Sequence, residues 1–262
     1  MKKIILLCLG LTLAISAQAK IVMEKVDYKQ AEAALEGFVV YDTTFAKPGK
    51  KLPGMVIVHD WMGVGDYVKV RAEQVAKLGY VAFVADIYGK GVRPKDGKEA
   101  SVLAGQYRNG DRKLLRARAE AALNELQKNK FVDTTKISAM GYCFGGTTVL
   151  EMARAGQKIK SALSFHGNLA AVSKDDAKNI KVPLLIMHGA IDPYVSPEEV
   201  ATFQKELNDA GVDYQFISYS GAVHAFTEAH VGSDTKSGAA YNKKADERST
   251  EAMKTFLAEV NK

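Results

Sequence analysis

Cysteine is almost absent from this sequence, with two residues, Cys8 and Cys143, among 262. Small exported domains that depend on disulfide bonds carry several cysteines, so a disulfide framework is excluded. Cys8 lies in an apolar N-terminal run that we expect to be removed, which leaves Cys143 as a single free thiol. A lone thiol is a liability in an oxidising compartment, and a function at Cys143 would explain its presence.

Apolar sequence long enough to span a bilayer comfortably is also lacking at the N-terminus, where the run extends only from Ile4 to Ile15. The run follows Lys2-Lys3 and precedes Ala17-Gln18-Ala19, whose small-x-small form is typical of a signal-peptide cleavage site. Cys8 sits inside the run rather than at its end, so it does not resemble a lipid-attachment cysteine. We therefore predict that residues 1–19 are a cleaved bacterial signal peptide. The mature protein should be periplasmic or secreted, with no membrane anchor.

Charge of one sign is not concentrated anywhere in the chain. The 36 Lys and Arg residues outnumber the 30 Asp and Glu residues, for a formal net charge of +6, but they are spread out and mixed with acids. No basic stripe with interleaved aromatic residues argues for a nucleic-acid partner. No His, Cys, Asp or Glu residues recur at convincing metal-ligand spacing, so no metal site is expected. The predicted partner is a small-molecule substrate, and the predicted assembly is a monomer or small homo-oligomer.

The remaining chain, residues 20–262, suits one large domain, and no composition shift suggests a second. Apolar runs such as Met55–His59 and Tyr80–Ala85 alternate with segments of helical spacing such as Asp66–Leu78. Near-continuous apolar strands separated by helices predict an α/β fold, with a mostly parallel central sheet covered by helices on both faces. The other expected strands are 37–41, 137–140, 161–165, 183–187 and 214–219, and the other expected helices are 111–128, 147–153, 197–209 and 242–260.

One short stretch, Gly141–Gly146, has the sequence Gly-Tyr-Cys-Phe-Gly-Gly and lies between a predicted strand and a predicted helix. A strand, a sharp turn and a helix with Gly-x-nucleophile-x-Gly at the turn is the nucleophile elbow of α/β-hydrolases. The turn holds its central residue in a strained backbone conformation, which requires glycine on both sides. The alternative is a tight turn that contains a buried structural cysteine.

Two further polar residues, Asp192 and His224, follow predicted strands later in the chain. Nucleophile, acid and histidine in that order are typical of α/β-hydrolases, and active residues of parallel sheets gather at the carboxyl ends of the strands. His224 would accept the thiol proton of Cys143, while Asp192 would orient the imidazole and stabilise its charged form. Taken singly, Asp192 could be a turn residue and His224 a solvated surface residue.

The other histidines are expected to be structural. His166 and His188 end predicted strands beside glycines, which favours hydrogen-bonded turn residues over catalytic ones. His230 is expected to be exposed.

With these motifs the chain resembles the dienelactone hydrolase family of α/β-hydrolases, over essentially all of the mature sequence. The segments that carry the resemblance are 141–146, 188–192, 224–226 and 241–248. A cysteine at the elbow is specific, because most relatives in the wider fold carry serine there. The resemblance implies an α/β-hydrolase fold and hydrolysis of a lactone or ester through an acyl-cysteine intermediate, without a cofactor. It implies Cys143 as nucleophile, His224 as base and then acid, and Asp192 as the orienting carboxylate.

An oxyanion formed in this reaction needs main-chain N–H donors. We expect one from Phe144, directly after the nucleophile, and a second from Trp61, in the loop after an early strand; Trp61 could equally be a packing residue. In the best-known family members a glutamate in this loop contacts the resting thiol. The matching residue here is the shorter Asp60, which is therefore a thiol partner or a loop cap.

Substrate recognition departs from the family pattern. Members that act on dienelactone hold the substrate carboxylate with arginines, one of them shortly after the histidine, where this chain has Glu228. Arg93 and Arg108 could substitute, although both are expected to be solvated. The mechanism therefore carries over better than the substrate.

We therefore expect an exported cysteine-dependent hydrolase of small carboxylic esters or lactones. A thioesterase that uses the same three residues is the alternative within enzymes. From another class, the alternative is a non-hydrolytic thiol-based ligand-binding or redox-sensing protein with Cys143 poised beside His224.

Overall fold

The structure, a computed structural model, describes residues 20–262, so the predicted signal peptide lies outside the described residues. In this part of the chain eight strands form one sheet, in the order β1-β2-β4-β3-β5-β6-β7-β8. The strands are β1 (Ile21–Gln30), β2 (Ala33–Asp42), β3 (Leu52–Val58), β4 (Val81–Ala85), β5 (Val132–Tyr142), β6 (Ala162–Phe165), β7 (Leu184–Gly189) and β8 (Tyr214–Tyr219). The α-helices are α1 (Asp66–Ala76), α2 (Gly97–Arg108), α3 (Lys113–Gln127), α4 (Phe144–Arg154), α5 (Pro197–Asp209) and α6 (Lys243–Val260).

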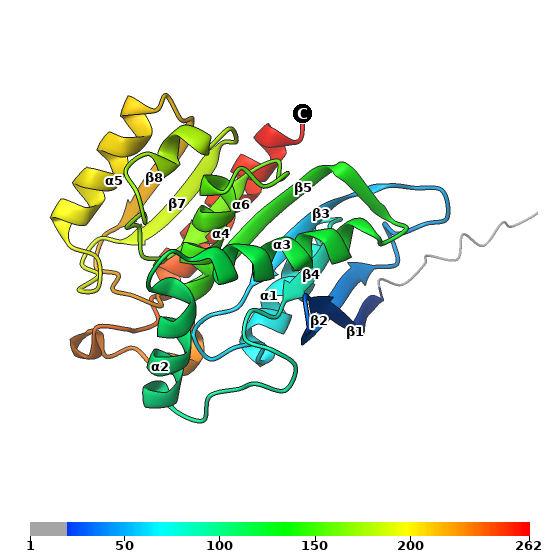
Figure 1. Cartoon of the computed structure of the whole chain (residues 1–262), viewed down its shortest axis with the longest axis horizontal. Helices are drawn as coiled ribbons and strands as arrows, with labels where there is room; N and C mark the ends of the chain where they lie inside the picture. The colour runs from blue at the N-terminus through cyan, green and yellow to red at the C-terminus, as the bar shows by residue number, and fades with distance from the viewer. Residues whose placement is uncertain (1–19) are drawn as a thin grey trace, which may run out of the picture.

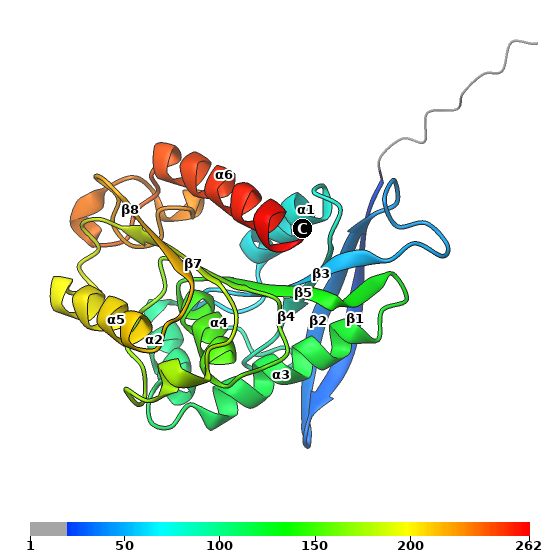
Figure 2. The same cartoon turned by 90° about the horizontal axis from the view of Figure 1, so that it is seen from above.

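The strands from β3 to β8 are parallel, whereas β2 is antiparallel to both of its neighbours and carries β1 at the edge of the sheet (Figure 1). Figure 2 shows α1 and α6 on one face of the sheet and α2, α3, α4 and α5 on the other. Each face of the sheet buries its own apolar cluster. One cluster includes Val75 of α1 and Phe256 of α6, and the other includes Leu115 of α3 and Phe203 of α5. The predicted α/β class and mostly parallel sheet are confirmed.

The central strands are apolar on both faces because helices cover both. All five residues of β4 and all six of β7 are buried. Their near-continuous apolar sequences therefore identify these strands. Strands of a sheet covered on one face only would instead alternate apolar and polar residues. No helix among residues 20–262 is long and apolar enough to cross a membrane.

Two elements were missed by the sequence prediction. β1 lies at the edge of the sheet and is mostly exposed or half-buried, so its sequence lacks an apolar run. α2 begins after Asp96, whose side chain accepts a hydrogen bond from the Glu99 N–H, and occupies residues that the prediction left without structure. Arg112 adopts a left-handed conformation (φ 55°) between α2 and α3, and this break separates the two helices.

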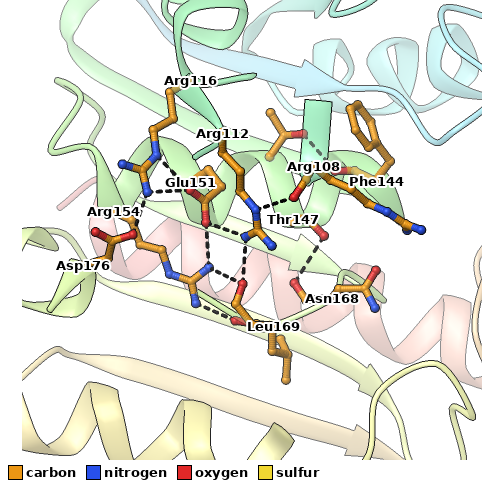
Figure 3. Close-up of polar contacts among 12 residues, drawn as sticks. Arg108, Arg112, Arg116, Phe144, Thr147, Glu151, Arg154, Asn168, Leu169 and Asp176 are labelled. Carbon is orange, nitrogen blue, oxygen red and sulfur yellow. Dashed lines mark hydrogen bonds and ion pairs between the residues drawn. The ribbon is translucent and has the colours of Figure 1, made fainter. Parts of the chain in front are cut away.

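A fully buried acid, Glu151 of α4, ties α4 to α3 and to the loop after β6 (Figure 3). Nη1 of Arg154 and Nη1 of Arg112 each lie 2.9 Å from its Oε1, and Nη2 of Arg116 lies 2.7 Å from its Oε2. Arg112 also donates to the main-chain oxygen of Ala170 at 2.8 Å. Burial alone would raise the pKa of Glu151, but the three guanidinium groups outweigh burial and lower it.

Replacing Glu151 with Gln leaves these guanidinium groups without their carboxylate. We expect Glu151→Gln to lower the free energy of unfolding by about 3–5 kcal/mol, the usual cost of breaking a buried ion pair, measured by urea denaturation. Glu120→Gln, at an exposed position of α3, is the matched control and should change stability by less than about 0.5 kcal/mol. Equal effects of the two substitutions would show that the buried network does not stabilise the fold.

Candidate active site

Cys143 stands between the end of β5 and the start of α4, in a strained backbone conformation (φ 54°, ψ −114°). No side chain fits at the glycines two residues before and two residues after it. A Cβ on Gly141 would lie 2.2 Å from the Gly145 oxygen, and a Cβ on Gly145 would lie 2.2 Å from the Val58 oxygen. The strand, turn and helix thus approach as closely as the Gly-x-Cys-x-Gly pattern predicts.

The loops after β7 and β8 bring Asp192 and His224 to this turn. His224 Nε2 lies 3.0 Å from Cys143 Sγ, and His224 Nδ1 lies 2.8 Å from Asp192 Oδ2. Asp192 and His224 are 6% and 7% exposed, so neither is the solvated or turn-only residue that the sequence left open. The structure brings together the three residues that the sequence singled out.

These contacts favour a charged imidazole. Burial alone disfavours a charge on His224, but Cys143 and Asp192 outweigh burial and raise the pKa of His224 well above its ordinary value. A protonated ring donates from both nitrogens, one to the Asp192 carboxylate and one to the sulfur of Cys143. One of these N–H groups then points at the Cys143 sulfur, 3.0 Å away.

His166, after β6, holds the main chain of the nucleophile. The Cys143 N–H is shared between the Phe165 oxygen at 3.0 Å and His166 Nδ1 at 3.1 Å. Because Nδ1 accepts, the ring proton is on Nε2, which lies 2.7 Å from Thr227 Oγ1; that hydroxyl is 2.6 Å from Tyr67 OH. Burial, reinforced by nearby positive charge, lowers the pKa of His166 well below its ordinary value. His166 is thus the hydrogen-bonded turn residue predicted from the sequence.

His59 fixes the loop that contains Asp60 and Trp61. Its Nδ1 lies 2.5 Å from the Asp60 oxygen, and its Nε2 accepts a hydrogen bond from the Ile87 N–H at 3.2 Å. The ring stacks on Phe144, with 5.8 Å between centroids. Burial lowers the pKa of His59 to about 4, so the ring is neutral. This buried histidine therefore joins the ends of β3 and β4 to the first residue of α4.

The two expected oxyanion donors, Phe144 and Trp61, belong to the two segments that His59 holds together. Phe144 is the first residue of α4, and the first N–H groups of a helix have no intrahelical partner. Trp61 is 39% exposed and lines the same cavity as Cys143, and its main-chain oxygen accepts a hydrogen bond from Tyr88 OH at 2.9 Å. The indole therefore forms part of the cavity wall.

Asp60 is buried, and its Oδ1 accepts a hydrogen bond from the Met62 N–H at 2.6 Å, which makes an Asx-turn within its own loop. Burial raises the pKa of its carboxyl group. Among residues 20–262 no hydrogen bond joins Asp60 to Cys143, whose sulfur contacts His224 instead. The geometry favours the loop-cap interpretation over the thiol-partner one.

A cavity of about 540 Å³ opens over Cys143 and His224. Its wall includes Tyr194, whose ring meets His224 edge-on at 5.3 Å between centroids, and Arg108, which is exposed as predicted. Figure 3 shows the Arg108 side chain outside the contacts of the Glu151 network. Arg93 is half-buried, and its guanidinium donates to main-chain oxygens that include that of Val64 at 2.9 Å, so it is not the freely solvated side chain that the sequence predicted.

The remaining expectations have mixed outcomes. His230 is exposed, as predicted. His188 was expected to be hydrogen-bonded, but its buried Nδ1 has no partner within residues 20–262, so that expectation is wrong for this atom. The described residues contain no group of three His, Cys, Asp or Glu side chains able to hold a metal ion.

Comparison with known proteins identifies the family of this chain. The family model described as the dienelactone hydrolase family matches residues 39–261. The chain belongs to the dienelactone hydrolase family. A solved structure of a dienelactone hydrolase-like promiscuous phosphotriesterase from metagenomic libraries is 36% identical, with a TM-score of 0.85, and the match covers 92% of this chain and 98% of that one. A Bradyrhizobium sp. protein named "Probable 2-oxo-3-(5-oxofuran-2-ylidene)propanoate lactonase" is 28% identical, over 68% of this chain and 75% of its own.

This dienelactone hydrolase family member is a lactone or ester hydrolase with the α/β-hydrolase fold. The sequence missed His59 as a positioning residue, because its partners come from three separate segments. It also missed Tyr194, and no local pattern marks Tyr194 as part of the cavity wall.

The close approach of the elbow to β3 can be tested by adding one methyl group. We expect Gly145→Ala to lower the free energy of unfolding by about 3 kcal/mol or to prevent folding, because the methyl group would overlap the Val58 oxygen. Gly65→Ala is the matched control, since a Cβ there would lie 3.9 Å from the Gly63 oxygen, an ordinary van der Waals contact. Chemical denaturation measures both, and a Gly145→Ala protein as stable as the control would contradict this packing.

Proposed function

We propose that this family member is an exported cysteine-dependent hydrolase of small carboxylic esters or lactones. The observation that carries the proposal is the continuous contact from Cys143 Sγ to His224 Nε2 at 3.0 Å and from His224 Nδ1 to Asp192 Oδ2 at 2.8 Å. A thiolate paired with an imidazolium that a buried carboxylate orients is an activated nucleophile.

In the acylation step the thiolate of Cys143 attacks the carbonyl carbon and forms a C–S bond, while the carbonyl electron pair moves to oxygen. The main-chain N–H groups of Phe144 and Trp61 donate to this oxyanion. When the tetrahedral intermediate collapses, the C–O bond breaks and His224 gives its proton to the leaving oxygen. In a lactone this oxygen stays attached to the acyl chain, so ring opening produces a hydroxyl group on the acyl-enzyme.

In the deacylation step neutral His224 accepts a proton from water, and the resulting hydroxide attacks the acyl-cysteine carbonyl. Collapse of the second tetrahedral intermediate breaks the C–S bond and releases a carboxylic acid, with Cys143 again a thiolate. Asp192 stabilises the imidazolium at each stage. No cofactor enters either step.

Two observations support small esters or lactones as the substrate class. The cavity of about 540 Å³ lies within the range of small-molecule sites. The Bradyrhizobium relative is named a lactonase, which favours a cyclic ester among the candidates.

Export is supported by residues 1–19, which have the positive start, apolar run and Ala-x-Ala end of a bacterial signal peptide. The lone thiol of the mature chain fits that compartment if the thiol is catalytic and not structural.

Turnover by substituted proteins tests the mechanism. Cys143→Ala, His224→Ala and Asp192→Asn should each lower kcat/KM for p-nitrophenyl acetate, a dienelactone and an acyl thioester by roughly 10³-fold or more, because the three residues act as a unit. Steady-state kinetics of residues 20–262 measure this, and the preferred substrate distinguishes lactonase, esterase and thioesterase.

Thiol alkylation by iodoacetamide provides the control for the competing class. Hydrolysis is contradicted if wild-type protein turns over no member of the panel while Cys143 is still alkylated rapidly. That outcome would favour thiol-based sensing or ligand capture. Cys143→Ala protein that folds normally and retains turnover would exclude the cysteine as nucleophile.

Export makes a separate prediction. When the full-length chain is expressed in a bacterium, the processed protein should appear in the periplasmic fraction or the medium with Lys20 as its first residue. N-terminal sequencing checks the cleavage position, and Ala19→Arg is the variant that should block it. Retention of residues 1–19 on the wild-type protein would contradict export by this route.

A further inference from the structure

Glu228 is a buried carboxyl group in the wall of the active-site cavity, and the proposed mechanism does not use it. The residue is 3% exposed and lines the cavity with Cys143 and His224. Its Oε1 has no hydrogen-bond partner within residues 20–262. The other oxygen, Oε2, lies 3.7 Å from the exposed His230 and also has no hydrogen bond among the described residues. Because an unmade buried hydrogen bond is costly, a ligand oxygen that paired with this carboxyl group would bind favourably.

Among residues 20–262 no Lys or Arg side chain forms an ion pair with this carboxyl group. Arg71 of α1 is the buried cation in the region, but its Nη2 is bound to Asp246 Oδ1 at 2.9 Å and to the Thr227 main-chain oxygen. On another side, Asp60 brings a second buried acid from the loop after β3. The neighbouring acid disfavours a second negative charge at Glu228.

The surrounding rings also leave Glu228 without a strong partner. His166 Nε2 is 3.9 Å from Oε1, but this neutral ring donates to Thr227. His230 Nε2 is 3.7 Å from Oε2 and is exposed to water. His224 is engaged on both nitrogens. Tyr67, from α1, bonds the hydroxyl of Thr227.

These surroundings keep Glu228 protonated near neutral pH. Burial is the largest effect and Asp60 adds to it, so that the pKa of Glu228 rises to about 8 even though His224 and Arg71 oppose the shift. Tyr142, the other titratable ring close to Glu228, is buried and neutral. A protonated carboxyl group has an O–H donor and a carbonyl acceptor.

We propose that Glu228 is a specificity-determining residue, whose neutral carboxyl group donates a hydrogen bond to an uncharged carbonyl or hydroxyl oxygen of the substrate and disfavours a substrate carboxylate at the same place. The inference rests on the proposed function and names the substrate class of that site. It differs from carboxylate binding by arginine, because the position four residues after His224 carries an acid.

Glu228 would discriminate between substrates because an unsuitable substrate leaves a buried polar group without a hydrogen-bond partner. An apolar acyl chain would leave the O–H of Glu228 without an acceptor, and a carboxylate would be buried beside two acids with no paired cation. Arg108 also lines the cavity and is exposed. A carboxylate-bearing ester therefore tests whether Arg108 outweighs Glu228.

The test uses three p-nitrophenyl esters with acyl chains of matched length. They are the 5-oxohexanoate, which has a neutral carbonyl, the hemiglutarate, which has a carboxylate, and the hexanoate, which has neither. Values of kcat/KM, corrected for uncatalysed hydrolysis, are measured from about pH 6.5 to about pH 9.5. Wild-type protein should prefer the oxohexanoate to the hexanoate by roughly tenfold at neutral pH, the effect of one hydrogen bond, and should hydrolyse the hemiglutarate most slowly.

Three variants separate the role of Glu228 from other ionisations. In wild-type protein the preference for oxohexanoate should disappear as the pH rises through about 8, because the donor is lost. Glu228→Gln keeps a donor that does not titrate, so its preference should persist at high pH, whereas Glu228→Ala should lack the preference at every pH. Glu199→Gln is the matched control, because Glu199 lines the same cavity but accepts from two main-chain N–H groups; it should show the wild-type pH dependence.

Thermal unfolding provides a readout that needs no turnover. A carboxyl group whose pKa is raised in the folded state contributes stability below its unfolded pKa and loses that contribution as the pH rises through its folded pKa. The Tm of wild-type protein relative to Glu228→Gln should therefore fall between about pH 4.5 and about pH 8. A Tm difference that does not change over this interval would overturn the protonated state of Glu228.

The kinetic outcomes distinguish this inference from the proposed function. Hydrolysis of none of the three esters by wild-type protein would overturn both. Hydrolysis with the same substrate ratios in wild-type and Glu228→Ala protein would overturn the role of Glu228 alone, as would a preference for the hemiglutarate.

Discussion

The strained backbone at Cys143 is the constraint on which the active site depends. A residue at φ 54° and ψ −114° persists only if its surroundings hold it there. Here β3 approaches Gly145 where no side chain would fit, and the Cys143 N–H is shared between the Phe165 oxygen and His166. The strain is thus offset by contacts from two neighbouring strands, and the same contacts direct the sulfur toward His224. A side chain at Gly145 would therefore disturb the nucleophile and the fold together.

Three buried imidazoles at the ends of strands show that partners, and not burial alone, decide charge. His59 and His166 each accept a main-chain N–H on one nitrogen, which fixes a neutral tautomer, and burial lowers the pKa of both. His224 is as deeply placed but faces Cys143 and Asp192, which raise its pKa. Neutral rings hold the two loops of the site in position, while in the proposed mechanism the charged ring supplies the proton that moves. Structural and reactive histidines are therefore separated by what each nitrogen contacts.

Sequence patterns predicted those parts of the protein that depend on local periodicity. The elbow, Asp192 and His224 each follow an apolar strand, and parallel strands bring such positions together at one edge of the sheet. β1 was missed because this edge strand lacks an apolar run. α2 was missed because Arg112 interrupts the helical region and separates α2 from the predicted helix that became α3. The role of His59 was not predictable, since its contacts with Asp60, Ile87 and Phe144 join segments far apart in the sequence.

The same distinction explains why mechanism and substrate recognition can vary separately. The reacting side chains follow the parallel strands β5, β7 and β8, and they contact one another, so a change in any of them disturbs the hydrogen bonds that join them. Glu228 and Arg108 belong to connecting segments: one follows His224 by four residues and the other ends α2. Replacing an arginine by an acid in such a segment changes the charge that a substrate meets without moving Cys143, because the elbow is held from β3 and β6. In our proposal, a cavity whose acid is protonated and has no Lys or Arg partner among the described residues selects for neutral oxygen atoms, whereas an arginine at that position would select for a carboxylate. One attacking thiolate can therefore serve substrates of opposite polarity within a single family.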